Sequence, residues 1–253
     1  MTEEKNGLRI SVITVCLNNA SGIEKTMQSV LCQNYPMIEY LVIDGGSTDG
    51  TVEKIEKYGS SLYYWNSRKD QGISDAFNRG LLKARGEYIA FLNSGDSYLN
   101  PRSLELLAKG AEGYDVIYGG IRYERSCRAD VYPQRIAKQS DWLRGSIPHQ
   151  SSITSRKVFD RVGLFNQARK YCMDYELFYK AFLAQFRFKA IPELITSVNC
   201  DGVSTKQWKA QLDEFRMVQR DLGAPWFPAG YHYYRRLLRM GLAYSLRRYG
   251  LNG

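Results

Sequence analysis

The 253-residue chain is 44% hydrophobic and 24% charged, as in globular proteins, and has neither an apolar run long enough to span a membrane nor a signal-peptide pattern. Five scattered cysteines without a C-x-x-C pair indicate reduced thiols in a cytoplasmic protein and argue against a zinc site. The formal net charge of +9 fits nucleic acid, an anionic membrane or a phosphorylated substrate as partner, and simple solubility equally well.

The first hundred residues alternate between strand-like and helix-like segments. The patterns predict strands over 8–16, 38–43, 62–65 and 88–92, and helices that follow Ser21 (the expected cap) and cover 51–58 and 74–84. This alternation predicts an α/β fold whose parallel sheet carries helices on both faces. Small and acidic residues follow each strand, so we expect these loops to converge at one edge of the sheet. Neither G-x-G-x-x-G nor a P-loop occurs, which disfavours a dinucleotide enzyme or a P-loop ATPase.

The apolar run 88–92 breaks abruptly into Asn93, Ser94, Gly95 and Asp96. A short apolar run bounded by turn residues is typical of a buried strand. Asp96 then falls beyond the carboxyl end of that strand, where open α/β sheets bind ligands, and Gly95 lets a ligand or backbone approach closely. Taken alone, the same residues also fit an ordinary polar turn.

The second half is less regular. It predicts strands over 116–123, 129–132 and 192–200, a short helix over 157–162, and a helix from about 171 to 186. Asp174, at the start of that last helix, fits an N-cap. His149 falls at a strand edge, and the loop 201–205 suits an anion bound by backbone amides.

Four segments together resemble glycosyltransferase family 2, whose members are inverting enzymes with the GT-A fold. They are I-S-V-I-T-V-C-L-N-N (10–19), L-V-I-D-G-G-S-T-D-G-T (41–51), the stretch from D-Q-G-I-S-D-A-F-N-R-G to F-L-N-S-G-D (70–96), and V-G-L-F-N with M-D-Y-E-L (162–177). The resemblance is greatest to the branch that builds bacterial surface polysaccharides. It implies a mixed, mostly parallel sheet in a domain over 1–225, with a nucleotide-binding half (8–100) and an acceptor half (101–205). The composition changes after this domain, where a basic tail (226–253) follows.

The resemblance also implies roles for single residues. Asp174 matches the catalytic base, and Asp96 matches the last acid of the family's D-x-D motif, which would bind Mn²⁺ or Mg²⁺ on the donor diphosphate. His149 and Gln150 would line the acceptor side, and Gly202 and Ser204 the leaving diphosphate. The UDP-sugar itself would be held by Val15, Leu17, Asn18, Asp44, Asp70, Gly72, Asp75, Asn78, Asn93 and Gly95.

Two positions depart from the family pattern. Asn93 replaces the first acid of the metal motif, and Gly45 replaces the second acid of the common D-D-G-S loop. Because one carboxylate binds a hard cation less firmly than two, these changes leave open a non-catalytic family member that serves as an assembly partner.

The last residues form a basic, aromatic tail. Read as a helix over 231–249, it puts Arg235, Arg236, Arg239 and Arg247 on one side, and Tyr234, Leu237, Leu238 and Tyr244 on the other. Such a helix fits either the inner face of the cell membrane, beside a lipid-diphosphate-linked saccharide acceptor, or packing on the domain. The charge and the 19 tyrosines raise nucleic-acid binding as a rival, but many aromatics fall within predicted core segments, so we expect no nucleic-acid partner.

Overall fold

The structure is a computed structural model. It describes residues 7–124, 130–133, 135–136, 138–142, 147–199, 207–225, 229–231, 233–235 and 237–238. Among these residues no helix combines the length and the apolar character needed to cross a bilayer.

The described strands form one eight-stranded sheet in the order β3-β2-β1-β4-β7-β6-β8-β5. Its first four strands are parallel: β1 (Ile10–Cys16), β2 (Ile38–Asp44), β3 (Tyr64–Ser67) and β4 (Tyr88–Phe91). The remaining strands are β7 (Ser152–Ser155), β6 (Val116–Tyr123), β8 (Phe188–Val198) and β5 (Ser97–Tyr98). β7 runs antiparallel to both β4 and β6, so the predicted parallel order holds for the first half and the sheet as a whole is mixed.

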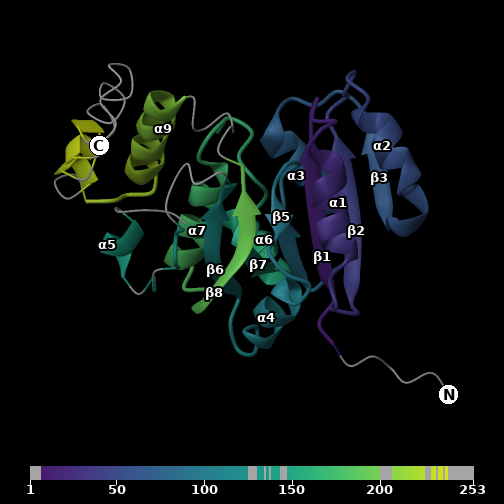
Figure 1. The fold of residues 1–253 in the computed structure, drawn as a ribbon. Helices are drawn as coiled ribbons and strands as arrows, with labels where there is room; N and C mark the ends of the chain where they lie inside the picture. Colours follow the sequence, from purple (N-terminus) through teal and green to yellow (C-terminus); the bar gives the residue numbers. More distant parts are fainter. Residues whose placement is uncertain are drawn as a thin grey trace, which may run out of the picture.

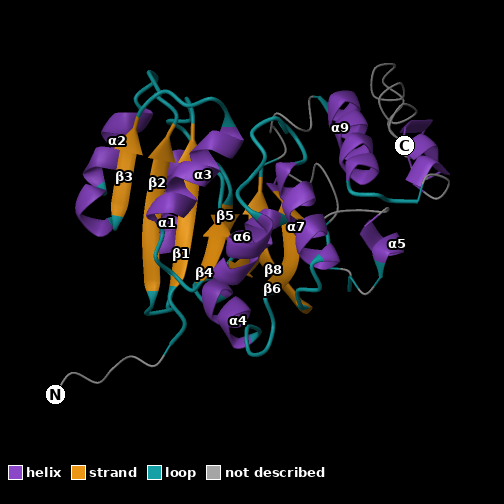
Figure 2. Cartoon of the chain, turned by 180° about the vertical axis from the view of Figure 1, so that it is seen from behind, coloured by secondary structure: helices purple, strands orange, loops and turns teal. Residues whose placement is uncertain are grey.

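Helices cover both faces of this sheet. α1 (Ile23–Leu31), α2 (Thr51–Lys57) and α4 (Ser103–Lys109) share one buried cluster with the strands. α3 (Ile73–Lys83), α6 (Arg156–Val162) and α7 (Met173–Leu183) share the cluster on the opposite face. Figure 1 looks onto the side that carries α1, and Figure 2 onto the side that carries α3 and α6.

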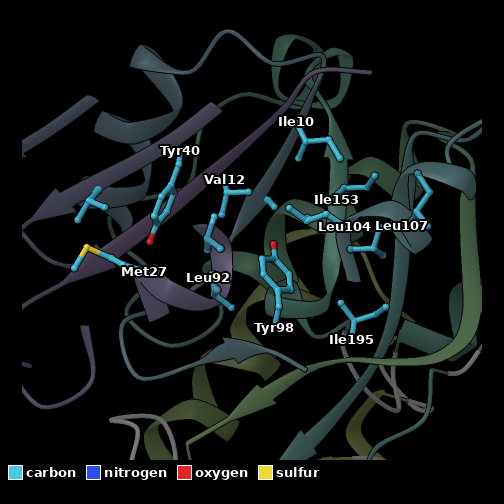
Figure 3. Close-up of a cluster of buried hydrophobic side chains, with 14 of the residues drawn as sticks. Ile10, Val12, Met27, Tyr40, Leu92, Tyr98, Leu104, Leu107, Ile153 and Ile195 are labelled. Atoms are coloured by element: carbon cyan, nitrogen blue, oxygen red, sulfur yellow. The ribbon is translucent and has the colours of Figure 1, made fainter. Parts of the chain in front are cut away.

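Alternation along the strands explains this division. Ile10 and Val12 of β1 pack with Met27 and Leu104 on the first face, whereas Ile13 and Val15 face the other cluster. Figure 3 shows the first cluster, where side chains from α1, α4 and several strands meet. β1 and β4 lie between these two buried clusters. The packing on both faces therefore fixes the position of the loops that follow the two strands.

A third cluster packs the last described long helix, α9 (Trp208–Asp221), against α7. Trp142, at the end of the short helix α5 (Gln139–Trp142), is fully buried and stacks on Tyr179 with ring centroids 5.6 Å apart. Tyr175 stacks on Phe215 of α9 at 4.0 Å. α9 is therefore part of the same core as the helix that carries Asp174.

Several sequence predictions need correction. Ser21 does not cap α1: its hydroxyl donates to Asn19, and it is Asn19 that accepts the Gly22 amide. Asp174 lies inside the first turn of α7, whose N-cap is Cys172, so the N-cap interpretation was wrong. Of the strand expected over 129–132, the described residues show a single bridge between Val131 and Ile121.

Candidate active site

The loops after β1 and β2 are joined by side-chain hydrogen bonds. Asn18 adopts a left-handed conformation (φ 47°), its amide donates to the Ser47 hydroxyl at 2.7 Å, and its side-chain oxygen accepts the Thr48 amide at 2.9 Å. The next amide, that of Asn19, donates to the Thr51 hydroxyl at 3.0 Å. The two predicted nucleotide loops thus form one surface at the carboxyl edge of the sheet, beside the exposed side chain of Leu17.

Asp44 organises the second of these loops. Its carboxylate accepts the amides of Gly46 and Ser47 at 2.9 and 2.8 Å and the Ser67 hydroxyl at 2.6 Å. Burial raises the pKa of Asp44, but the hydrogen bonds from Ser47 and Ser67 outweigh burial and hold the pKa below its usual value. The structure therefore uses this ionised, fully buried carboxylate to shape the loop.

Asp70 occupies the space that a side chain at Gly45 would need. A Cβ atom built on Gly45 would lie 2.4 Å from Oδ2 of Asp70. Oδ1 of Asp70 accepts the amide of Gly72, a residue at φ 116°, so the carboxylate is fixed against its own turn. A carboxylate from the neighbouring loop thus occupies the space beside position 45.

Other predicted nucleotide residues serve mainly to position backbone. The side chain of Asn78 is buried. Its Nδ2 donates to the Phe165 carbonyl and its Oδ1 accepts the Phe165 amide, both at 2.9 Å. The Val15 carbonyl accepts the Ser94 amide at 3.0 Å, and Asp75 accepts the Gln71 amide at 3.2 Å. Gly202 and Ser204, predicted for the diphosphate, lie outside the described residues.

The 93–96 loop is held by α1 and by the loop after β1. Oγ1 of Thr26 accepts the Gly95 amide at 2.9 Å and donates to the Asp96 carbonyl at 2.7 Å. The Asn19 side chain donates to the Ser94 carbonyl at 2.9 Å. Gly95 has φ 101°, a conformation that L side chains rarely adopt, which accounts for glycine at this position.

Asp96 is a buried carboxylate, 5% exposed, and no described lysine or arginine forms an ion pair with it. Burial raises its pKa to about 6, although the Asn199 amide on Oδ1 (3.0 Å), the His149 ring and the Gln150 side chain act in the opposite direction. A cation close by would stabilise the ionised form of this buried carboxylate. The buried Oδ1 of Asn93, which accepts no hydrogen bond from the described residues, is a second hard oxygen in the same loop.

These oxygens fit a hard divalent cation that receives its remaining ligands elsewhere. The described residues hold no group of three or more histidine, cysteine or acidic side chains suited to a metal. Mg²⁺ and related ions are commonly bound through one or two protein oxygens together with substrate phosphates. Asp96 therefore suits a cation that arrives with a diphosphate better than a permanently bound one.

Asp174 lies close to this loop through one imidazole ring. Nδ1 of His149 is 2.8 Å from Oδ2 of Asp174, and Nε2 of the same ring is 3.2 Å from Nδ2 of Asn93. The side chains of His149 and Asp174 are only 12% and 19% exposed. The ring of His149 therefore lies between Asp174 and the 93–96 loop, and its acceptor-side role stays a prediction.

A second set of contacts, which the sequence analysis missed, holds the start of α7. Glu214 of α9 accepts the amides of Lys170, Tyr171 and Cys172 at 3.0, 3.0 and 2.8 Å. The helical spacing of Leu212, Phe215 and Val218, all buried, would have predicted α9 itself. No signal in the sequence indicates that Glu214 reaches a segment some forty residues earlier.

A partly buried ion-pair network continues along the same interface. Arg169 contacts Glu176 of α7 at 2.7 Å and Asp221 of α9 at 2.6 Å, and Lys180 contacts Glu176 at 2.6 Å. Burial raises the pKa of Glu176, but the hydrogen bonds from Lys180 and Arg169 outweigh it and leave the pKa lowered. The first turn of α7 is thus held from both sides of Asp174.

The chain matches the model of the family described as glycosyl transferase family 2 over residues 11–174. An uncharacterized glycosyltransferase of Mycobacterium tuberculosis is 30% identical over 183 residues, which are 69% of each chain. TuaG of Bacillus subtilis, named for teichuronic acid biosynthesis, is 37% identical over 92 residues, 35% of this chain and 36% of TuaG.

Solved structures show a similar fold. TarS 1–349 of S. aureus in complex with UDP-GlcNAc superimposes with a TM-score of 0.68 at 22% identity, over 85% of this chain and 65% of that one. A mannosyltransferase of Pyrobaculum calidifontis, in complex with GDP-Man and Mn²⁺, gives 0.65 at 17% identity, over 96% of this chain and 81% of its own. The family match ends at Asp174, so α9 and Glu214 lie beyond it.

Proposed function

This chain belongs to glycosyltransferase family 2, as an enzyme with the GT-A fold, and from that premise we propose that it transfers a hexose or hexosamine from a UDP-sugar to a saccharide hydroxyl with inversion. The observation that carries the proposal is the single imidazole between Asp174 and the 93–96 loop. The base that deprotonates the acceptor and the loop that binds the donor diphosphate must lie on either side of one sugar. A single imidazole ring between Asp174 and the 93–96 loop brings them that close. The name of TuaG supports a product in cell-surface polysaccharide synthesis.

In this mechanism Asp174 is the catalytic base. It takes the proton of the acceptor hydroxyl while that oxygen attacks the anomeric carbon, and the bond from this carbon to the diphosphate oxygen breaks with its electron pair leaving on UDP. The base is held through both oxygens, since Oδ1 accepts the Tyr175 amide at 2.8 Å and Oδ2 contacts His149. A carboxylate fixed in this way keeps its orientation during the displacement.

Asp96 would hold Mn²⁺ or Mg²⁺ together with the donor diphosphate. The cation supplies neutralisation of the negative charge that grows on the departing UDP. The Mn²⁺ bound with GDP-Man in the Pyrobaculum calidifontis mannosyltransferase supports this assignment, as does the burial of the Asp96 carboxylate, whose pKa is raised to about 6. Leu17, Asp70 and Gly72 then form the nucleotide edge.

Substitution of the base tests the reaction. Asp174→Asn is expected to lower kcat by about two to four orders of magnitude with the donor KM nearly unchanged. Donor hydrolysis and transfer are measured with a panel of UDP-, GDP- and dTDP-sugars, with and without Mn²⁺, and thermal shift reports binding separately. If the folded variant transfers sugar at the wild-type rate, Asp174 is not the base. If no nucleotide sugar raises Tm, the assembly-partner alternative is favoured instead.

We further propose that the tail, over 231–249, contacts an anionic membrane that carries a lipid-linked acceptor. Tyr231, Tyr234 and Leu238 are 57%, 63% and 68% exposed and share one helical face by their spacing. Of the other residues that the sequence prediction included, Arg235 is exposed and Leu237 half-buried, whereas Arg236, Arg239, Arg247 and Tyr244 lie outside the described residues. Flotation with anionic liposomes tests the contact: replacing the three exposed apolar residues with serine should reduce binding, and equal binding would exclude this face.

A nucleic-acid partner has less support. Phe91 and Phe178 are buried, and Tyr88 is half-buried with its hydroxyl on the Tyr114 carbonyl at 2.6 Å. Base stacking requires exposed aromatic faces. Salt-sensitive binding of random oligonucleotides, without any response to UDP, would reverse this conclusion.

A further inference from the structure

We propose that Asn93 and His149 form a positioning chain for the base, in which Nδ1 of His149 donates a hydrogen bond to Asp174 and Asn93 holds the other edge of the ring. This inference deepens the proposed function and rests on it. His149 is a positioning residue here, because it acts through Asp174 and does not itself touch the reacting atoms.

The hydrogen-bond partners determine which nitrogen carries the proton. Nδ1 lies 2.8 Å from Oδ2 of Asp174, and a carboxylate oxygen accepts, so Nδ1 carries a hydrogen and donates it to the base. Nε2 of the same ring lies 3.2 Å from Nδ2 of Asn93, so this amide holds the opposite edge of the imidazole.

Packing fixes the plane of the ring. Phe77, which is fully buried, contacts the imidazole edge-on, with centroids 5.8 Å apart and planes at 71°. The His149 carbonyl accepts the Ser152 hydroxyl at 2.9 Å, and the residue lies in the short helix η3 (His149–Ser151) directly before β7. The imidazole is therefore held by strand, ring and loop before any substrate arrives.

This arrangement gives a reason for asparagine at position 93. An amide offers a donor on one atom and an acceptor on the other. Nδ2 contacts His149, while Oδ1 accepts no hydrogen bond from the described residues and stays available to a cation. A carboxylate has no hydrogen to donate, so it would instead require a hydrogen on Nε2. Asn93, which replaces the first acid of the family's metal motif, thus also positions His149 and, through it, the base.

Histidine tautomers are read directly by nitrogen NMR. The chain has two histidines, so ¹⁵N-labelled protein gives two ring spin systems, and His232→Gln assigns them. The proposal expects a hydrogen on Nδ1 of His149 in the wild type. A wild-type spectrum with the hydrogen on Nε2 alone would overturn it.

Kinetics separate positioning from acceptor binding. His149→Leu removes the hydrogen bond to Asp174 and should lower kcat about 10- to 100-fold with both KM values within about two-fold. His149→Asn places an amide donor near the position of Nδ1 and should recover much of the loss, whereas His149→Gln, whose amide falls near Nε2, should not. An effect confined to the acceptor KM would contradict the proposal and restore the acceptor-side role.

The role of Asp174 as base and the role of His149 in positioning it can be refuted separately. If Asp174→Asn is inactive while His149→Leu keeps the wild-type kcat, the enzyme stands and the positioning chain is wrong. If Asp174→Asn keeps full activity, the assignment of the base is wrong whatever tautomer His149 adopts.

Discussion

Replacing Glu214 with alanine should loosen the start of α7, the helix that carries Asp174. The three amides that Glu214 accepts belong to Lys170, Tyr171 and Cys172. A hydrogen bond to a charged group contributes about 1.5 to 3 kcal/mol, and a buried amide left without an acceptor costs a similar amount. Cys172 is buried, whereas Tyr171 is half-buried and Lys170 exposed, so water replaces much of what those two lose. We therefore expect the free energy of unfolding to fall by about 3 kcal/mol.

Thermal and urea unfolding measure this loss. For a chain of this length about 3 kcal/mol corresponds to a fall in Tm of about 6 to 12 °C. Asp213→Ala is the matched control, because Asp213 is the exposed acid one position earlier and its hydrogen bond is to the Tyr233 hydroxyl at 2.6 Å. Because α7 orients Asp174, kcat per folded molecule should also fall in Glu214→Ala. Equal Tm and kcat values in the two variants would refute the idea that Glu214 holds the start of α7.

Three other residues of the site can be tested by substitution. Gly45→Asp should lower Tm and weaken the stabilisation by UDP, because its Cβ would lie 2.4 Å from Asp70, and adding Asp70→Gly should restore both. Burial raises the pKa of Asp96 to about 6, so without metal its ionisation destabilises the fold as pH rises through that range. Asp96→Asn should therefore raise the metal-free Tm at neutral pH and abolish the Tm shift by Mn²⁺ with UDP. The pKa of Glu176 is lowered, so its contribution to the free energy of unfolding is present at neutral pH and lost on acidification. In Glu176→Gln, the free energy of unfolding measured in urea should therefore depend less on pH in the acidic range.

The first half of the fold could be predicted because its patterns are local. The helical spacing of Ile23, Met27, Val30 and Leu31 predicts the inner face of α1, and the first three are buried, whereas Leu31 is 38% exposed. β1, β2 and β4 begin and end within two residues of their expected bounds. β3 starts two residues later than predicted, because Leu62 follows the turn η1 (Gly59–Ser61) and pairs with no strand. The order of β5 to β8 depends on pairings between distant segments, which local patterns do not encode.

The site shows the same division. The loops after β1, β2 and β4 were expected at one edge, and they lie there. What residue type alone did not indicate is that Asn78 and Asp44 are committed to neighbouring backbone, or that His149 contacts Asp174. Each of these facts depends on which partner lies within hydrogen-bond reach after folding, and a residue's own neighbours in the chain do not determine that.

Thr26 limits which positions around the site can vary. Its buried hydroxyl accepts the Gly95 amide and donates to the Asp96 carbonyl, so a side chain on the inner face of α1 sets the path of the 93–96 loop. Thr26→Val keeps the shape and removes only that oxygen. Laboratory evolution toward new sugars should therefore tolerate changes on the rim of the site while it retains a hydroxyl that no substrate meets.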